Sequence, residues 1–166
     1  HFTLVAAAAA GVYIMTLWTQ GFIRDDRWLI AGNRLMHQGL RGAPRILASG
    51  YVQMVMGTQA TIQEYRPLLA LSYLMHFVTT GTSPWPMHAI NVLLHAAACC
   101  LLLAALRRRM EPPAALAAAL LFAVMPVHAE DVSYITSRSE LLVAVCVLGA
   151  WLLLERHNAA GGLALF

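Results

Sequence analysis

The amino-acid sequence predicts an all-α integral membrane protein. Hydrophobic residues make up 60% of the chain and charged residues only 11%, whereas soluble domains carry about 25% charged residues. The mean hydropathy is +0.64, and several apolar runs approach the length of about 20 residues that a helix needs to cross a bilayer. The net charge of +3 is scattered along the chain, so nucleic acid is not an expected partner.

Four apolar stretches are the predicted membrane spans. They cover residues 1–22, 85–106, 113–127 and 139–155, and the third is short for a bilayer. Residues 163–166 begin a further apolar stretch that would open another span. Because the chain begins with a histidine and ends inside an apolar run, we expect it to be an incomplete part of one larger membrane domain.

Residues 23–84 form the predicted external loop, which carries two juxtamembrane helices. The first covers residues 26–38, where apolar residues recur at helical spacing and arginines occupy the polar side. The second covers residues 67–79, begins with a proline that suits a first helical position, and is too short to span. A connector of weak helix propensity, residues 50–63, lies between them. Both helices are expected to lie on the membrane surface.

The distribution of basic residues predicts the orientation. Arg107–Arg109 form the densest basic cluster, and short basic loops stay on the cytoplasmic side. With residues 67–79 on the surface, this cluster, Arg156–His157 and the N-terminus all lie in the cytoplasm. The loop 23–84 then faces outside although it contains six arginines, so we expect an anionic partner for it. The loop 128–138 also faces outside.

Polar residues of interest gather at the external ends of the predicted spans. The acidic pair Asp25–Asp26 directly follows the first span. Carboxylates there can receive a proton, hold a metal ion or orient a hydroxyl group. The alternative is an ordinary helix start, because acidic residues favour the first helical turn. A second polar stretch contains His128, Glu130 and Arg138, for which a solvated loop is the alternative interpretation.

Three polar residues lie within the second predicted span. His88, Asn91 and His95 are three and four residues apart, so they share one helix face. Polar groups at membrane depth usually face the interior of a bundle, and hydrogen bonding between helices is favoured over ligand or metal binding. Seven histidines make a haem or metal redox protein an alternative, although His95 has no evident partner at its depth.

Four segments resemble a known family when they are taken in order: FIRDDRWLIAGN, EYRPLLALSY, PWPMHAINVLLHA and LLFAVMPVHAEDVSYITSRSELL. Together they are similar to the N-terminal membrane region of TMTC-type protein O-mannosyltransferases and their bacterial relatives, which belong to the GT-C glycosyltransferases. The resemblance covers residues 22–155. It implies a GT-C-like fold with two juxtamembrane helices in the first external loop, in a bacterial inner membrane.

The resemblance also implies an activity and roles for individual residues. A sugar would pass from a polyprenyl-phosphate donor to an acceptor hydroxyl of a protein, lipid or glycan on the external face. Asp25 and Asp26 match the family's acidic pair and would be catalytic. Tyr65 lies in the matching YRPL motif. Arg66 and Arg138 would bind the donor phosphate, because an arginine fork matches phosphate geometry.

The remaining implied residues support this site. His88, His128 and Glu130 would be supporting polar groups, and a divalent cation could be held by Asp25, His128 and Glu130. Met125 stands where the family has the first histidine of its HP-x-H-x-E motif. Membrane lipids, the polyprenyl-phosphate sugar and other membrane subunits are the expected partners. This piece alone is expected to be inactive, and a non-catalytic accessory subunit of a larger membrane complex is the main alternative.

Overall fold

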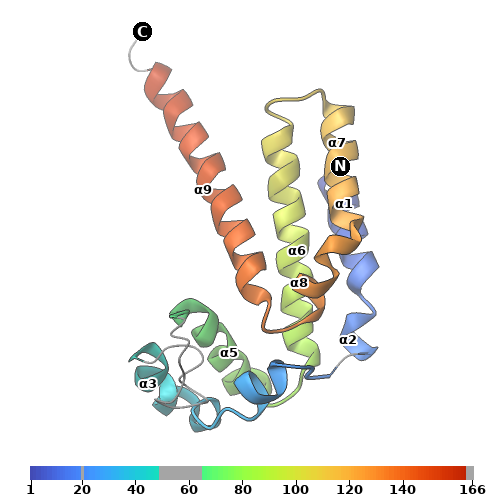
Figure 1. Cartoon of the computed structure of the whole chain (residues 1–166). Coiled ribbons are helices and arrows are strands. Elements are labelled where there is room, and N and C mark those ends of the chain that lie inside the picture. The colour runs from blue at the N-terminus through green and yellow to red at the C-terminus, as the bar shows by residue number, and fades with distance from the viewer. Residues whose placement is uncertain (20, 49–64, 164–166) are drawn as a thin grey trace.

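The structure, a computed structural model, describes residues 1–19, 21–48 and 65–163. Within these ranges every regular element is a helix, which confirms the all-α prediction. The predicted connector at residues 50–63 and the residues 164–166 of the further span lie outside the described residues. Figure 1 shows a bundle of long helices with a smaller helical lobe at one end.

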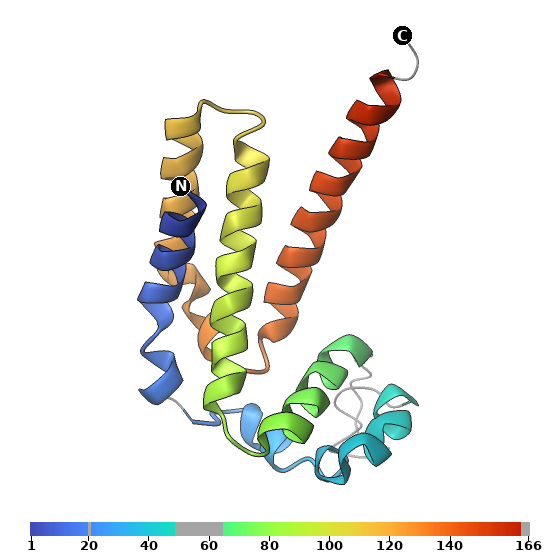
Figure 2. The same ribbon diagram turned by 180° about the vertical axis from the view of Figure 1, so that it is seen from behind.

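The bundle is centred on one long helix, α6 (Trp85–Leu106), whose bounds are those of the second predicted span. It contacts α1 (Phe2–Tyr13), α7 (Pro112–Val124) and α9 (Arg138–Leu163). Figure 2 shows α9 diverging from α6 towards its C-terminal end. Small residues dominate the contact between α1, α6 and α7. The buried residues there include Ala9, Ala96, Ala115, Ala119 and Ala123, and small side chains let helices approach closely.

The first predicted span, residues 1–22, is interrupted in the structure. Helix α1 ends at Tyr13, and a short helix α2 (Thr16–Thr19) follows. The Thr16 hydroxyl is buried and donates to the carbonyl oxygen of Tyr13 at 2.7 Å. A hydroxyl that bonds to nearby backbone competes with the regular helical pattern, which accounts for the break at this position.

One helix among the described residues, α6, is long and apolar enough to cross a membrane. A second candidate arises if α7 and the following short helices η4 (Pro126–His128) and α8 (Ala129–Ser133) form one span bent by 44°. Pro126 accounts for the bend, because proline lacks a backbone N–H and ends the preceding helix. The described residues therefore provide one or two candidate spans, and the four predicted spans are not confirmed.

In the lobe, two short elements lie where a single surface helix was predicted over residues 26–38. A π-helical turn, η1 (Arg27–Ala31), is followed by a 3-10 helix, η2 (Met36–Gly42). Asn33 separates them, since its side chain accepts from the amide of Leu35 at 3.0 Å and donates to the carbonyl of Leu29 at 3.1 Å. Such local bonds offer the backbone an alternative to a continuous helix.

Two further helices of the lobe lie within the described residues. Helix α3 (Ala43–Ala48) follows η2 directly. The bounds of helix α5 (Pro67–Thr80) are close to the predicted residues 67–79, and Gly81 directly follows its last residue. Gly81 has a φ of 66°, a left-handed conformation that glycine adopts without steric cost.

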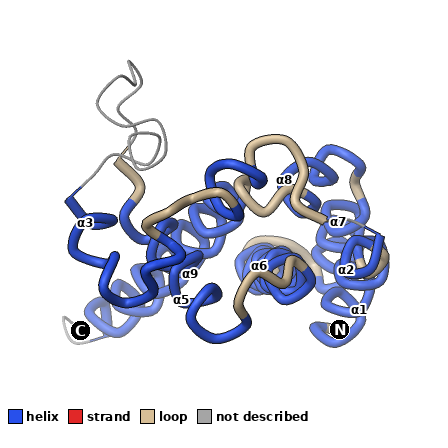
Figure 3. Tube along the Cα trace, turned by 90° about the horizontal axis from the view of Figure 1, so that it is seen from below, coloured by secondary structure: helices blue, strands red, loops and turns tan. Residues whose placement is uncertain are grey.

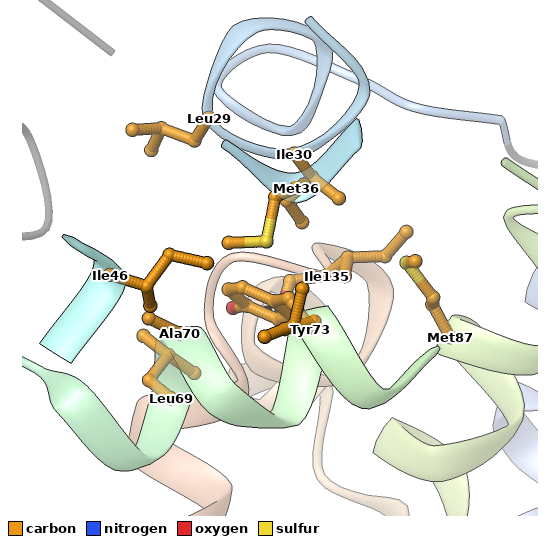
Figure 4. Close-up of a cluster of buried hydrophobic side chains, with 10 residues drawn as sticks. Leu29, Ile30, Met36, Ile46, Leu69, Ala70, Tyr73, Met87 and Ile135 are labelled. Carbon is orange, nitrogen blue, oxygen red and sulfur yellow. Dashed lines mark hydrogen bonds between the residues drawn. The ribbon is translucent and has the colours of Figure 1, made fainter. Parts of the chain in front are cut away.

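A shared hydrophobic core fixes the lobe to the bundle (Figure 4). Tyr73 of α5 lies at its centre. Met87 from α6 and Ile135 from the loop before α9 join this core. The remaining members are Leu29, Ile30, Met36, Ile46, Leu69, Ala70 and Leu74. The lobe is thus packed against the segment that links α8 to α9.

Candidate functional site

Residues 134–139, which link α8 to α9 and include the first two residues of α9, are where residues from distant parts of the chain meet. The Tyr73 hydroxyl of α5 donates to the carbonyl of Ile135 at 2.8 Å. The Asn91 amide of α6 donates to the carbonyl of Tyr134 at 2.8 Å. Figure 3 views the molecule from this end, with α5 beside the end of α6. We refer to residues 134–139 as the junction segment.

Asp26 fastens the first loop to the junction segment. Its carboxylate is fully buried and accepts a hydrogen bond from the amide of Thr136 at 2.9 Å. It also accepts from the amides of Ile135 and Ile23, both at 3.4 Å. The residue stands at the N-terminus of η1, yet its side chain makes no capping bond to that helix. Asp26 therefore joins two segments that are 110 residues apart.

Asp25 differs from its neighbour, because it is exposed. Its backbone carbonyl accepts from the amide of Leu29 at 2.8 Å and so helps to start η1. Arg24, directly before it, has a φ of 46° and lies with its guanidinium 5.3 Å from the centre of the Tyr134 ring. The acidic pair thus consists of one buried carboxylate that is hydrogen-bonded to backbone amides and one residue that is exposed to solvent.

Arg138 is the largest fully buried side chain in the described chain, at 1% exposure. Its Nε donates to Asn91 Oδ1 at 3.0 Å, its Nη1 to Ser72 Oγ at 3.1 Å, and its Nη2 to the carbonyl of Met87 at 3.0 Å. The guanidinium also lies 4.9 Å from the centre of the Tyr73 ring. This Arg138 cluster joins α5, α6 and the start of α9.

Arg66 lies at the edge of an apolar groove. Its Nη1 donates to Ser139 Oγ at 3.1 Å, and the side chain is only partly buried. The groove has a volume of about 530 Å³ and runs between α5 and α9. Its lining is almost entirely apolar and consists of Arg66, Pro67, Leu68, Leu69, Ser72, Ser139, Leu142, Val143 and Cys146. The structure therefore combines a cationic side chain with a slot suited to a hydrocarbon chain.

Tyr65 and His88 lie near the same region in different environments. Tyr65 is exposed and donates its hydroxyl to the carbonyl of Leu47 at 2.9 Å. His88 is fully buried at the start of α6 and has a ring nitrogen 3.4 Å from the carbonyl oxygen of Gly21. Tyr65 thus contacts the backbone of the loop at residues 23–84, and His88 contacts the backbone just before that loop.

His128 and Glu130 belong to another part of the structure. The His128 ring packs against Phe122, with centroids 4.3 Å apart, and against His95 at 5.1 Å. Glu130 is exposed on α8. Among the described residues no group of three His, Cys, Asp or Glu side chains is placed to hold a metal ion. The metal site of Asp25, His128 and Glu130 stays a prediction.

Met125 contributes a backbone hydrogen bond between helices. Its carbonyl oxygen accepts the hydroxyl of Tyr13 at 3.0 Å, which connects α1 to the end of α7. The neighbouring His95 has a ring nitrogen 3.1 Å from the carbonyl oxygen of Ala123. Hydrogen bonding between helices, the favoured interpretation of Asn91 and His95, agrees with these contacts.

Sequence reasoning missed Ser72, Tyr73 and Ser139. Each is a polar group in or beside an apolar helix, and each bonds to an arginine or to the junction segment. A polar pair at residues 72–73 within the apolar run of α5 was the available signal. His76 lies on the same helix, where burial, and next the positive charge of Arg138, lower its pKa from the ordinary value of 6.5.

Comparison with known proteins reveals relatives over most of the chain. The chain is 32% identical over 160 residues, 95% of its length, to protein O-mannosyl-transferase TMTC1 of Mus musculus. It is 33% identical over 153 residues to protein O-mannosyl-transferase Tmtc1 of Drosophila melanogaster, and 29% identical over 150 residues to protein O-mannosyl-transferase TMTC3 of Mus musculus. These alignments cover 92% and 90% of the chain.

The chain spans less than a fifth of the length of these curated relatives: 17% of mouse TMTC1, 18% of the fly protein and 16% of mouse TMTC3. No family model matches the chain. No solved structure matches it either. Over nearly its whole length, the chain is therefore similar to a segment of the TMTC protein O-mannosyl-transferases.

Proposed function

We propose that this chain is part of a polytopic membrane glycosyltransferase that transfers a mannosyl group from a polyprenyl-phosphate donor to a Ser or Thr hydroxyl of a protein. The observation that carries the proposal is the similarity to the TMTC protein O-mannosyl-transferases over 95% of the chain. The exposed Asp25 and the Arg66 groove supply the two kinds of group that such a reaction needs.

Asp25 is the proposed general base. The reaction forms a bond between the acceptor oxygen and the anomeric carbon of the sugar, while the bond from that carbon to the phosphate oxygen breaks. The acceptor proton passes to the Asp25 carboxylate, and the electron pair of the broken bond leaves with the lipid phosphate. Asp26 is a positioning residue, because its hydrogen bonds to Ile135 and Thr136 fix the turn that carries Asp25.

The groove between α5 and α9 is the proposed donor site. Its apolar lining suits the lipid chain, and Arg66 at its edge suits the negatively charged phosphate. Arg138, which the sequence assigned to the phosphate, has three of its nitrogens bonded to Asn91, Ser72 and Met87. We therefore give Arg138 the role of holding α5 against α9, so that it shapes the groove.

The proposed setting is a GT-C-like membrane domain in a bacterial inner membrane. α1 with α2, α6, the bent unit from α7 to α8, and α9 would be its spans, and the lobe would face outside. This arrangement puts Asp25 and the Arg66 groove at the external end of α6. The basic cluster Arg107–Arg109 would then lie in the cytoplasm, as short basic loops do.

The test is mannosyl transfer by the full-length protein in membranes supplied with polyprenyl-phosphate mannose and a Ser/Thr acceptor peptide. Asp25→Asn is expected to lower the transfer rate by about 10²–10⁴-fold, the usual contribution of a general base. Thermal stability should be unchanged, because the Asp25 side chain is exposed. Glu111→Gln is the matched control, since Glu111 is an exposed carboxylate at the start of α7. Transfer by Asp25→Asn at the unaltered rate would refute the base assignment.

A further inference from the structure

The lobe carries a group of exposed arginines that the proposed reaction does not use. Arg27, Arg34, Arg41 and Arg45 are all exposed and extend from η1 through η2 to α3. We call these four residues the basic surface. Arg27 donates its Nε to the carbonyl of Phe22 at 3.0 Å, and its side chain is exposed.

The basic surface has few carboxylates near it among the described residues. Within the described part of the chain, none of the four arginines forms an ion pair; the described ion pairs join Arg108 and Arg109 to Glu155 at the other end of the bundle. The acids of residues 21–48 are Asp25 and Asp26, and Asp26 is buried against backbone amides. Positive charge therefore exceeds negative charge among the exposed side chains of residues 21–48.

The lobe is tied closely to the end of a candidate membrane span. Helix α5 ends at Thr80 and α6 begins at Trp85, so the link of residues 81–84 can reach only about 14 Å. Large apolar side chains are exposed among the arginines, with Trp28 at 38%, Leu40 at 63% and Leu47 at 41% exposure. Arginines mixed with exposed apolar groups are typical of segments that lie in the interface of a bilayer.

We propose that the basic surface docks on the bilayer itself by binding anionic phospholipid headgroups. The arginines would lie at the level of the lipid phosphates, and Trp28, Leu40 and Leu47 would enter the boundary between headgroups and acyl chains. Arginine suits this role, because its planar fork forms bidentate bonds with phosphate oxygens. Docking would hold the lobe at a fixed height above the membrane, together with η1, which begins two residues after Asp25.

The test uses the full-length protein in nanodiscs of phosphatidylcholine alone and in nanodiscs of phosphatidylcholine with phosphatidylglycerol. Amide hydrogen exchange of residues 27–48 should be slower in the anionic discs. Each arginine contributes up to about fivefold in the equilibrium between docked and free lobe. The difference should be lost in the combined variant Arg27→Gln, Arg34→Gln, Arg41→Gln, Arg45→Gln, and lost for the wild type at about 1 M salt, where the screening length is only about 3 Å.

The controls distinguish docking on lipid from unfolding of the lobe and from binding of a soluble anion. Arg156→Gln, an exposed arginine near the far end of α9, should leave the difference unchanged. Amide exchange of the combined variant in neutral discs should equal that of the wild type, which checks that the lobe of the variant is still folded. If the lobe of the variant is unfolded, the salt dependence of the wild type alone tests whether the lobe docks on anionic lipid. Equal exchange in both kinds of disc would overturn the proposal. So would equal protection by inorganic phosphate in neutral discs, because a soluble anion would then replace the lipid surface.

Discussion

The Arg138 cluster makes the most demanding prediction. Arg138→Met replaces arginine with another long, unbranched side chain that can fill much of the same space. It removes the guanidinium that bonds to Asn91, Ser72 and the carbonyl of Met87. Hydrogen bonds from a charged group contribute about 1.5–3 kcal/mol each. The three bonds are not independent, and the methionine recovers part of the packing energy. Each buried acceptor that is left without its donor costs about 1–3 kcal/mol, and because the three groups are coupled we expect a total loss of about 3–5 kcal/mol.

That loss is large compared with the stability of the protein. Unfolding free energies are about 5–15 kcal/mol, and each kcal/mol lowers the melting temperature by about 2–4 °C in a chain of this size. The Arg138→Met variant should therefore melt about 6–20 °C below the wild type in detergent, measured by the loss of helical circular dichroism. Arg138→Lys should fall between the two, because a lysine ammonium cannot reproduce the planar fork.

Two measurements make the reasoning refutable. Arg156→Met, at an exposed position, should leave the melting temperature unchanged. Ser72→Ala combined with Arg138→Met should lose less stability than the sum of the single variants, since contacting residues couple by about 0.5–3 kcal/mol. A melting temperature of Arg138→Met within about 2 °C of the wild type, less than 1 kcal/mol on the same scale, would show that the cluster does not stabilise the fold.

Three further predictions concern neighbouring residues. Asp26→Asn should lower the unfolding free energy by about 1–3 kcal/mol, because the new amide group cannot accept from Ile135 and Thr136 together; an unchanged chemical denaturation midpoint would contradict this. Arg66→Met should raise the KM for the lipid-phosphate donor and leave the acceptor KM unaltered in steady-state assays; equal changes in both would argue against a donor site. Burial and the charge of Arg138 lower the pKa of His76, so the folded protein favours the neutral histidine. The free energy of unfolding should therefore fall as the pH drops below about 6.5, where the histidine of the unfolded chain becomes protonated. His76→Gln should flatten this dependence of melting temperature on pH, while the exposed His157→Gln should not.

The parts of the fold that the sequence predicted well depend on long apolar periodicity. The bounds of α6 agree with the predicted span, and α5 begins at the predicted proline. The first loop was harder, because Asn33 breaks the helical pattern through its own side-chain bonds rather than through a change in apolar spacing. The break at Thr16 arises in the same way. Local side-chain bonding to the backbone is invisible to a periodicity argument.

The candidate site shows a similar limit. The sequence predicted that Asp25, Asp26, Arg66 and Arg138 lie on one side of the membrane. The structure brings Asp26 and Arg66 to the junction segment, which contains Arg138. The sequence alone could not show that one member of the acidic pair is buried and the other exposed. The burial of Asp26 depends on residues 135–136, which approach it from far along the chain. His128 and Glu130 lie on η4 and α8, and His128 is turned towards His95 and Phe122.

The way Asp26 holds the junction segment also determines which residues are free to vary. Its partners there are the amide groups of Ile135 and Thr136 rather than their side chains. Thr136 is only partly buried, so a wide range of residues can occupy that position while keeping the N–H group that Asp26 requires. Proline alone removes this donor. In a saturation library, position 136 should tolerate most substitutions except proline, whereas position 26 should accept almost none.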